Sequence, residues 1–78
     1  MRRTTPPFRV GIIGCGGISH AHAFGFGNLP SLFEVRTVCD SNQEAARRLA
    51  EPFGAPRICG DWREVIGDPE IDAVDILL

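Results

Sequence analysis

Six consecutive residues near the start of the chain place three glycines where an apolar run ends. They are Gly14, Cys15, Gly16, Gly17, Ile18 and Ser19, which fit Gly-x-Gly-x-x-(Gly/Ala) with Ser19 in the last small position. Such a turn lets backbone N–H groups reach a pyrophosphate at the positive end of a helix dipole. The six residues are therefore candidates for dinucleotide binding.

Asp40 is the second candidate, because it lies 26 residues after Gly14, where the next alternating segment ends. A carboxylate at this place accepts hydrogen bonds from the ribose hydroxyls of an adenosine and repels a 2′-phosphate. Ser41 and Asn42 follow, so neither neighbour is an arginine that would accommodate that phosphate. We therefore expect NAD as the cofactor, with NADP less suited. The alternative is a tight turn and a helix-capping acid that bind no ligand.

Hydrophobic periodicity supplies the elements that must position these residues. We predict strands over residues 9–13, 34–39, 57–59 and 71–78. Helices are predicted over 17–29, from the Ser41–Glu44 capping box to the stop at Gly54, and around 62–66. The fold class is thus α/β, a Rossmann-type parallel sheet that is incomplete, with four strands and three helices in the order β-α-β-α-β-α-β.

Side-chain patterns predict which faces are buried. In the first helix a stripe through Ile18, Ala21, His22, Gly25 and Leu29 is expected to face the sheet, and in the second the stripe is Ala45, Ala46, Leu49, Ala50 and Phe53. Trp62 and the phenylalanines are expected in core or interface positions. His20 and His22 would point about 200° apart on a helix, so we expect no metal site there, and a backbone carbonyl as the partner of His22.

Composition excludes several classes of protein. The chain has 78 residues, a net charge of −2 and a pI near 5.5, which gives no electrostatic footprint for nucleic acid. No apolar run approaches the length of a membrane span, and no apolar segment follows the paired arginines at residues 2–3 as an export signal would require. The three cysteines are widely spaced, which favours buried thiols in the cytoplasm. For Cys15 the alternative is a low-pKa thiol beside a helix N-terminus.

The sequence resembles the N-terminal part of the Gfo/Idh/MocA oxidoreductases. The likeness covers RVGIIGCGGISHAHA, VCDSNQEAARRLAEPFGA and DWREVIGDPEIDAVDILL, which is nearly the whole chain. It implies an NAD(P)-dependent oxidoreductase acting on a sugar, polyol or related carbonyl compound. It also implies a later His-bearing loop, a Glu-Lys-Pro segment and a substrate domain. All eight basic residues here are arginines, so no residue matches the family's catalytic lysine.

We therefore expect residues 1–78 to be a partial NAD(P)-binding domain, with the C-terminal substrate domain absent and no catalytic residue in the chain. A sheet that stops at its fourth strand leaves an open edge, so the isolated chain should be poorly stable or associate with the missing domain or with copies of itself. Leu77 and Leu78 could border the cofactor. The main alternative is a stand-alone NAD-binding regulatory module without catalysis. A methyltransferase is disfavoured by Ile12, which stands where such enzymes have an acid, and an FAD-binding half by the sequence beyond the glycines.

Overall fold

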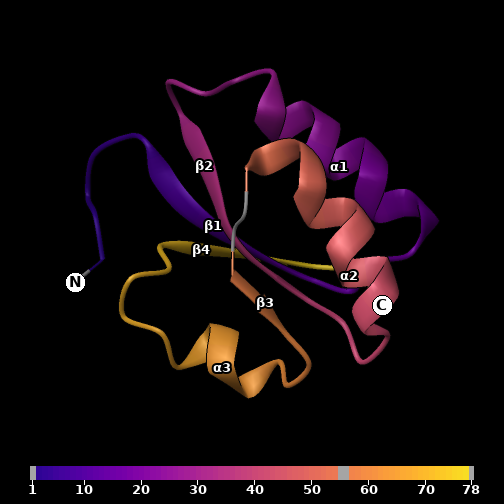
Figure 1. The fold of residues 1–78 in the computed structure, drawn as a ribbon. Helices are drawn as coiled ribbons and strands as arrows, with labels where there is room; N and C mark the ends of the chain where they lie inside the picture. Colours follow the sequence, from indigo (N-terminus) through magenta and orange to yellow (C-terminus); the bar gives the residue numbers. More distant parts are fainter. Residues whose placement is uncertain (1, 55–56, 78) are drawn as a thin grey trace.

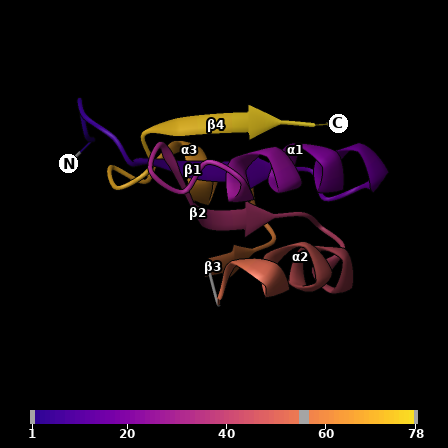
Figure 2. The same ribbon diagram turned by 90° about the horizontal axis from the view of Figure 1, so that it is seen from above.

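The computed structural model describes residues 2–54 and 57–77. Its four strands are β1 (Phe8–Ile13), β2 (Phe33–Cys39), β3 (Arg57–Cys59) and β4 (Ala73–Ile76). They form one parallel sheet in the order β3-β2-β1-β4. Seen from above in Figure 2, all four strands run in one direction, so their carboxyl ends share one edge. The predicted parallel sheet is confirmed.

The helices connect consecutive strands and cover both faces of the sheet. They are α1 (Gly17–Gly27), α2 (Gln43–Ala50), the short 3-10 helix η1 (Glu51–Phe53) and α3 (Arg63–Ile66). Figure 1 shows α1 and α2 together on one side of the strands and α3 on the other. The β-α-β-α-β-α-β order predicted from the sequence is therefore confirmed.

Two groups of buried side chains form the core, one on each face of the sheet. The α1 and α2 face holds Val10, Ile12, Cys15, Ala23, Val35, Val38, Ala46, Leu49 and Ala50. The α3 face holds Ile13, Cys39, Cys59, Val65 and Ile71. Because alternate residues of a strand point to opposite faces, β1 contributes to both groups and is buried along five of its six residues.

The predicted stripe of α1 is wrong. Ile18 is 64% exposed, whereas Ser19 and Ala23 are the buried residues of this helix. These two are four residues apart and small, so the helix can lie close to the sheet. The predicted stripe also contained the small residues Ala21 and Gly25, but it was out of phase by one residue, with Ile18 and His22 in place of Ser19 and Ala23.

The second helix has the predicted buried face but a different N-cap. Ala46, Leu49 and Ala50 are buried as expected. The cap is Asn42 and not Ser41, because Asn42 Oδ1 accepts hydrogen bonds from the N–H groups of Glu44 and Ala45 at 3.1 and 3.2 Å. The Asn42 N–H is itself bound to Asp40, which closes a turn and starts the helix one residue later than the capping box implies. Gly54 ends η1 with φ of 68°, the left-handed stop that was predicted.

An ion-pair network fixes the start of β4 against β1. Arg9 donates from Nε and from its backbone N–H to Asp72 Oδ2, at 3.0 and 2.7 Å, and from Nη1 to Glu70. The side chains of Arg9 and Asp72 are both buried. The structure places β4 at Ala73–Ile76, shorter than predicted, and Leu78 lies outside the described residues.

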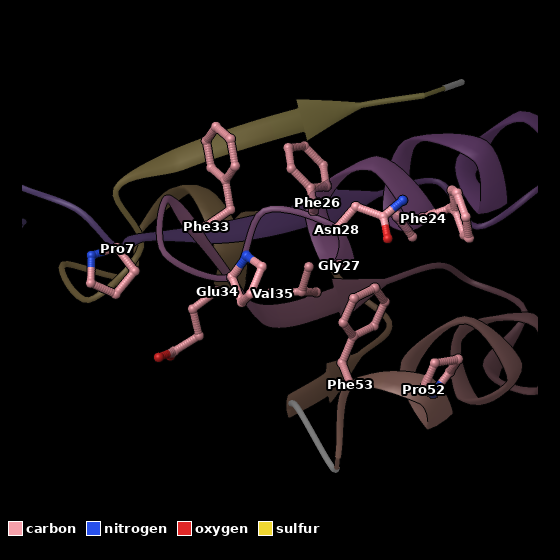
Figure 3. A pocket seen from close by; sticks show the side chains of 12 residues that line it. Pro7, Phe24, Phe26, Gly27, Asn28, Phe33, Glu34, Val35, Pro52 and Phe53 are labelled. Carbon is pink, nitrogen blue, oxygen red and sulfur yellow. The ribbon is translucent and has the colours of Figure 1, made fainter.

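A hollow of about 500 Å³ is lined by α1, the start of β2 and η1. Figure 3 shows Phe24, Phe26, Phe33 and Phe53 around it. The rings of Phe26 and Phe33 meet edge to face with centroids 5.2 Å apart. This hollow is lined by the beginning of β2, so it lies away from the carboxyl edge where the glycine-rich turn ends β1.

Candidate nucleotide-binding site

Gly14 makes the turn that leads out of β1. Its φ is +92°, a conformation that side chains rarely allow. A Cβ at this residue would lie 1.9 Å from the carbonyl oxygen of Leu77, the residue that follows β4. The Gly14 N–H donates to the carbonyl of Cys39 at 2.8 Å. The absence of a side chain therefore lets the turn pass close to the end of β4 and bond to the end of β2.

The first residues of α1 present backbone donors at the carboxyl edge. Gly16 is the N-cap, and its carbonyl accepts the Ser19 N–H at 3.1 Å and the Ser19 hydroxyl. The N–H groups of Gly16, Gly17 and Ile18 find no acceptor among the described residues. A Cβ on Gly16 or Gly17 would meet no atom within 4 Å, so the space in front of this backbone is open. Ser19, by contrast, is fully buried.

Asp40 follows β2 and faces the glycine-rich turn. Its Oδ2 accepts the Cys15 N–H at 2.7 Å, and its Oδ1 accepts the Asn42 N–H at 2.8 Å. These backbone hydrogen bonds lower the pKa of Asp40 below its ordinary value, so the group is ionised at neutral pH. A carboxylate offers about four acceptor positions; the N–H groups of Cys15 and Asn42 use two, and the Ser41 side chain also hydrogen-bonds to Asp40. One position remains for a hydroxyl such as that of a ribose.

Cys15 does not have the reactive thiol that its sequence position allows. The side chain is buried, and its sulfur lies 3.5 Å from the carbonyl of Cys39. Burial, and then the charge of Asp40, raise the pKa of Cys15 to about 11. The alternative of a low-pKa thiol is therefore wrong. Cys15 contributes its backbone N–H to the site and its side chain to the core.

A hollow of about 190 Å³ lies beside Asp40. It is lined by Ile13, Gly14, Cys39, Asp40, Ser41, Gly60 and Trp62. Sequence reasoning placed Trp62 in a core or interface, but the core placement is wrong because this side chain is 53% exposed. Residues that follow parallel strands gather at the carboxyl edge, so the place of Trp62 after β3 was the signal that pointed to this hollow.

His22 has a different hydrogen-bond partner from the predicted one. Its Nδ1 lies 2.8 Å from Asp75 Oδ2 on β4, so its partner is a carboxylate and not the expected backbone carbonyl. Residues 2–54 and 57–77 contain no cluster of three or more His, Cys, Asp or Glu side chains that could hold a metal ion. No helix in the described part of the chain is long and apolar enough to cross a membrane.

Comparison with known proteins decides the family. A family model for oxidoreductases with an NAD-binding Rossmann fold, GFO_IDH_MocA, matches residues 8–78. The chain belongs to this Gfo/Idh/MocA family. Its glycine-rich turn, α1 and Asp40 all lie within the matched NAD-binding Rossmann region.

Relatives of this Gfo/Idh/MocA chain include sugar and polyol dehydrogenases. A levoglucosan dehydrogenase from Pseudarthrobacter phenanthrenivorans is 38% identical over 74 residues, which is 86% of this chain and 19% of that protein. The myo-inositol dehydrogenase of Lactobacillus casei, solved with NAD(H) and myo-inositol, superposes with a TM-score of 0.81 at 32% identity, over 90% of this chain and 21% of that one. A 3-ketoreductase from Actinomadura kijaniata, solved with NADP, superposes with a TM-score of 0.76 at 29% identity, over 92% of this chain and 23% of that one. The chain thus spans about a fifth of the length of these relatives.

The residues of this Gfo/Idh/MocA chain fit a dinucleotide. Unbonded N–H groups at the start of α1 suit a pyrophosphate, and the open space before Gly16 leaves room for it. The carboxylate of Asp40, with an acceptor position left, suits a ribose hydroxyl. All of these groups lie at the carboxyl edge of the sheet, where open α/β sheets bind their ligands.

Proposed function

We propose that this chain is the NAD-binding part of a dehydrogenase that acts on a sugar, a polyol or a related carbonyl compound. The observation that carries the proposal is the convergence of the Gly14 turn, the unbonded N–H groups of α1 and the ionised Asp40 at one edge of the sheet. The family and the names of the relatives support the reaction class and the substrate class.

Each of the seven residues has a defined task in this proposal. Gly14 and Gly16 keep the turn tight and the backbone accessible, and the N–H groups of Gly16, Gly17 and Ile18 bind the pyrophosphate. Cys15 orients Asp40 through its N–H, and Ser19 holds the turn through the Gly16 carbonyl. Asp40 binds the adenosine ribose. NAD supplies the hydride acceptor when it is bound.

The reacting groups are proposed to lie outside these 78 residues. The chain contains no lysine, and its relatives are about five times longer. The outer edge of β4 exposes Val74 and Ile76, a surface that suits either a further part of the same protein or another copy of this chain. Three free buried thiols support a reducing compartment such as the cytoplasm.

Asp40 gives the sharpest test of the proposal. We expect the wild-type chain to bind NAD more tightly than NADP, because the ionised carboxylate repels a 2′-phosphate. Asp40→Asn removes the charge, so NAD binding should weaken about 10-fold or more and the preference over NADP should shrink. Isothermal titration calorimetry measures both affinities.

Glu51→Gln is the matched control, because it removes one carboxylate charge from an exposed position in η1. It should leave both affinities unchanged. Equal loss of NAD affinity in the two variants would show that Asp40 acts through net charge alone. Tighter binding of NADP than NAD by the wild-type chain would contradict the assignment of the ribose to Asp40.

A further inference from the structure

Trp62 is an exposed aromatic side chain beside the proposed nucleotide site. It is the only tryptophan of the chain and is 53% exposed. It lines the hollow that contains Asp40, and it also lines an adjoining hollow of about 190 Å³ with Ile13, Ile66 and Ile76. The indole therefore stands between the hollow that contains Asp40 and a second hollow lined by apolar side chains.

A cationic side chain lies beside this indole. The guanidinium carbon of Arg63 lies 5.6 Å from the ring centroid, within the range of a cation–π contact. Asp61 Oδ1 accepts from Arg63 Nε at 3.2 Å and from the Arg63 N–H at 3.0 Å. Both ionic side chains are exposed, so they orient the indole only weakly.

The chemistry of the hollow suits a planar base. Asp40 retains an acceptor position for a ribose hydroxyl, and the base joined to that ribose must lie within one sugar of the carboxylate. A volume of about 190 Å³ is below the range of roughly 300–1,000 Å³ for sites that enclose a drug-sized ligand, so it fits one part of a dinucleotide. Its walls beside Asp40 include the apolar side chains of Ile13 and Trp62.

We propose that Trp62 is the stacking wall of the adenine site and sets how tightly this chain holds the adenosine half of its cofactor. The inference rests on the proposed function, because it takes Asp40 as the ribose ligand. Stacking of a base on an aromatic side chain contributes enough that alanine substitution typically weakens binding about 5- to 100-fold.

The test is calorimetric titration of the 78-residue chain with ADP-ribose, which carries the adenosine and both phosphates but no nicotinamide. Trp62→Ala should weaken ADP-ribose binding about 5- to 100-fold. Trp62→Phe should recover most of the affinity and Trp62→Leu should not, because stacking needs a π surface and not only apolar bulk. ADP-ribose should also quench the fluorescence of the wild-type chain, since Trp62 is its only indole.

Phe24→Ala is the matched control, because Phe24 is an aromatic side chain that is 72% exposed and lines the hollow shown in Figure 3, away from the nucleotide site. It should leave ADP-ribose binding unchanged, and far-UV circular dichroism should show the same fold for every variant. Wild-type binding that Trp62→Ala changes by less than twofold would overturn the role of Trp62 and leave the proposed function standing. Failure of the wild-type chain to bind both ADP-ribose and NAD would overturn the proposed function, and the adenine site with it.

Discussion

At the scale of single residues, two glycines of the same turn are subject to different constraints. Gly14 is required by the fold, because its φ is positive and the carbonyl of Leu77 occupies the place of a side chain. Gly16 has φ of −77° and open space around it, so the fold itself accepts a side chain there. In the proposed site, Gly16 leaves room for the pyrophosphate.

A pair of alanine substitutions separates these constraints. Gly14→Ala should lower the free energy of unfolding by at least about 1–3 kcal/mol, the usual cost of a strained backbone conformation. Gly16→Ala should cost less, about 0.5–1 kcal/mol, because alanine is a poorer N-cap than glycine but adopts this φ without strain and clashes with nothing. Urea unfolding measures both. Calorimetry should then show that Gly16→Ala loses NAD affinity, and unchanged affinity would mean that the pyrophosphate does not approach this backbone.

Sequence patterns identified the residues of the turn and Asp40, because their spacing reflects the backbone path of one strand–turn–helix unit. They missed the surroundings of Trp62. That side chain lines the same hollow as Asp40 because β3 lies beside β2 in the sheet, a pairing between segments about 20 residues apart. The place of Trp62 after β3 indicates the carboxyl edge of the sheet, but a pattern along the chain does not show which side chains line one hollow there.

At the scale of elements, the position of β4 depends on a buried ion pair. Asp72 precedes β4 and receives hydrogen bonds from the side chain and the backbone of Arg9 in β1. The pairing of β1 with β4 begins at Val10 and Ala73, directly after Arg9 and Asp72. These hydrogen bonds therefore fix the position of β4, whose end lies close to the turn at Gly14. Loss of the pair should therefore loosen the edge of the sheet.

The pH dependence of stability should report this pair. Hydrogen bonds from Arg9 hold the pKa of Asp72 well below its usual range, and the unfolded value is about 3.9. A lowered folded-state pKa stabilises the protein fully above the unfolded value, and this contribution is lost as the pH falls below it. Asp72→Asn should thus destabilise the chain at pH 7, and its difference from wild type should shrink below about pH 4.

Thermal unfolding from pH 7 to pH 3 checks this expectation. Glu34→Gln is the control, because Glu34 pairs with Arg36 at an exposed position where ion pairs contribute little. It should destabilise the chain less than Asp72→Asn does at pH 7. A difference between wild type and Asp72→Asn that stays constant down to pH 3 would show that Asp72 does not titrate as this pair requires.

The type and order of the helices and strands were predictable because hydrophobic periodicity depends on residues close together in the sequence. The sequence of β1 is a continuous apolar run because both faces of this strand are covered. The buried face of α1 was not predictable in the same way. Its contact residues, Ser19 and Ala23, are small, and hydrophobicity alone ranks them below the exposed Ile18. The distance at which a helix packs on a sheet decides that choice, and it is a property of the folded molecule.

At the scale of the whole molecule, the three cysteines are distributed over both faces of the sheet. Cys15 belongs to the core beneath α1 and α2, whereas Cys39 and Cys59 belong to the core beneath α3. Burial raises the pKa of Cys15 to about 11 and that of Cys39 to about 12. Because the thiolate is the reactive form, ionisation alone should slow these two thiols about 100-fold or more relative to an ordinary cysteine at pH 8.

Thiol labelling should therefore report opening of the whole sheet. In the native chain all three cysteines should react slowly with an aromatic disulfide reagent, and low concentrations of urea should accelerate them together, because exposing both cores requires global unfolding. A ligand that binds only the folded state stabilises it by RT ln(1 + [L]/Kd), so NAD at about 100 times its Kd should slow labelling about 100-fold. Mass spectrometry of the labelled peptides gives the three rates separately. If NAD slowed Cys15 while Cys39 and Cys59 kept their rates, the face beneath α1 would open on its own, and the two cores would not share one unfolding transition.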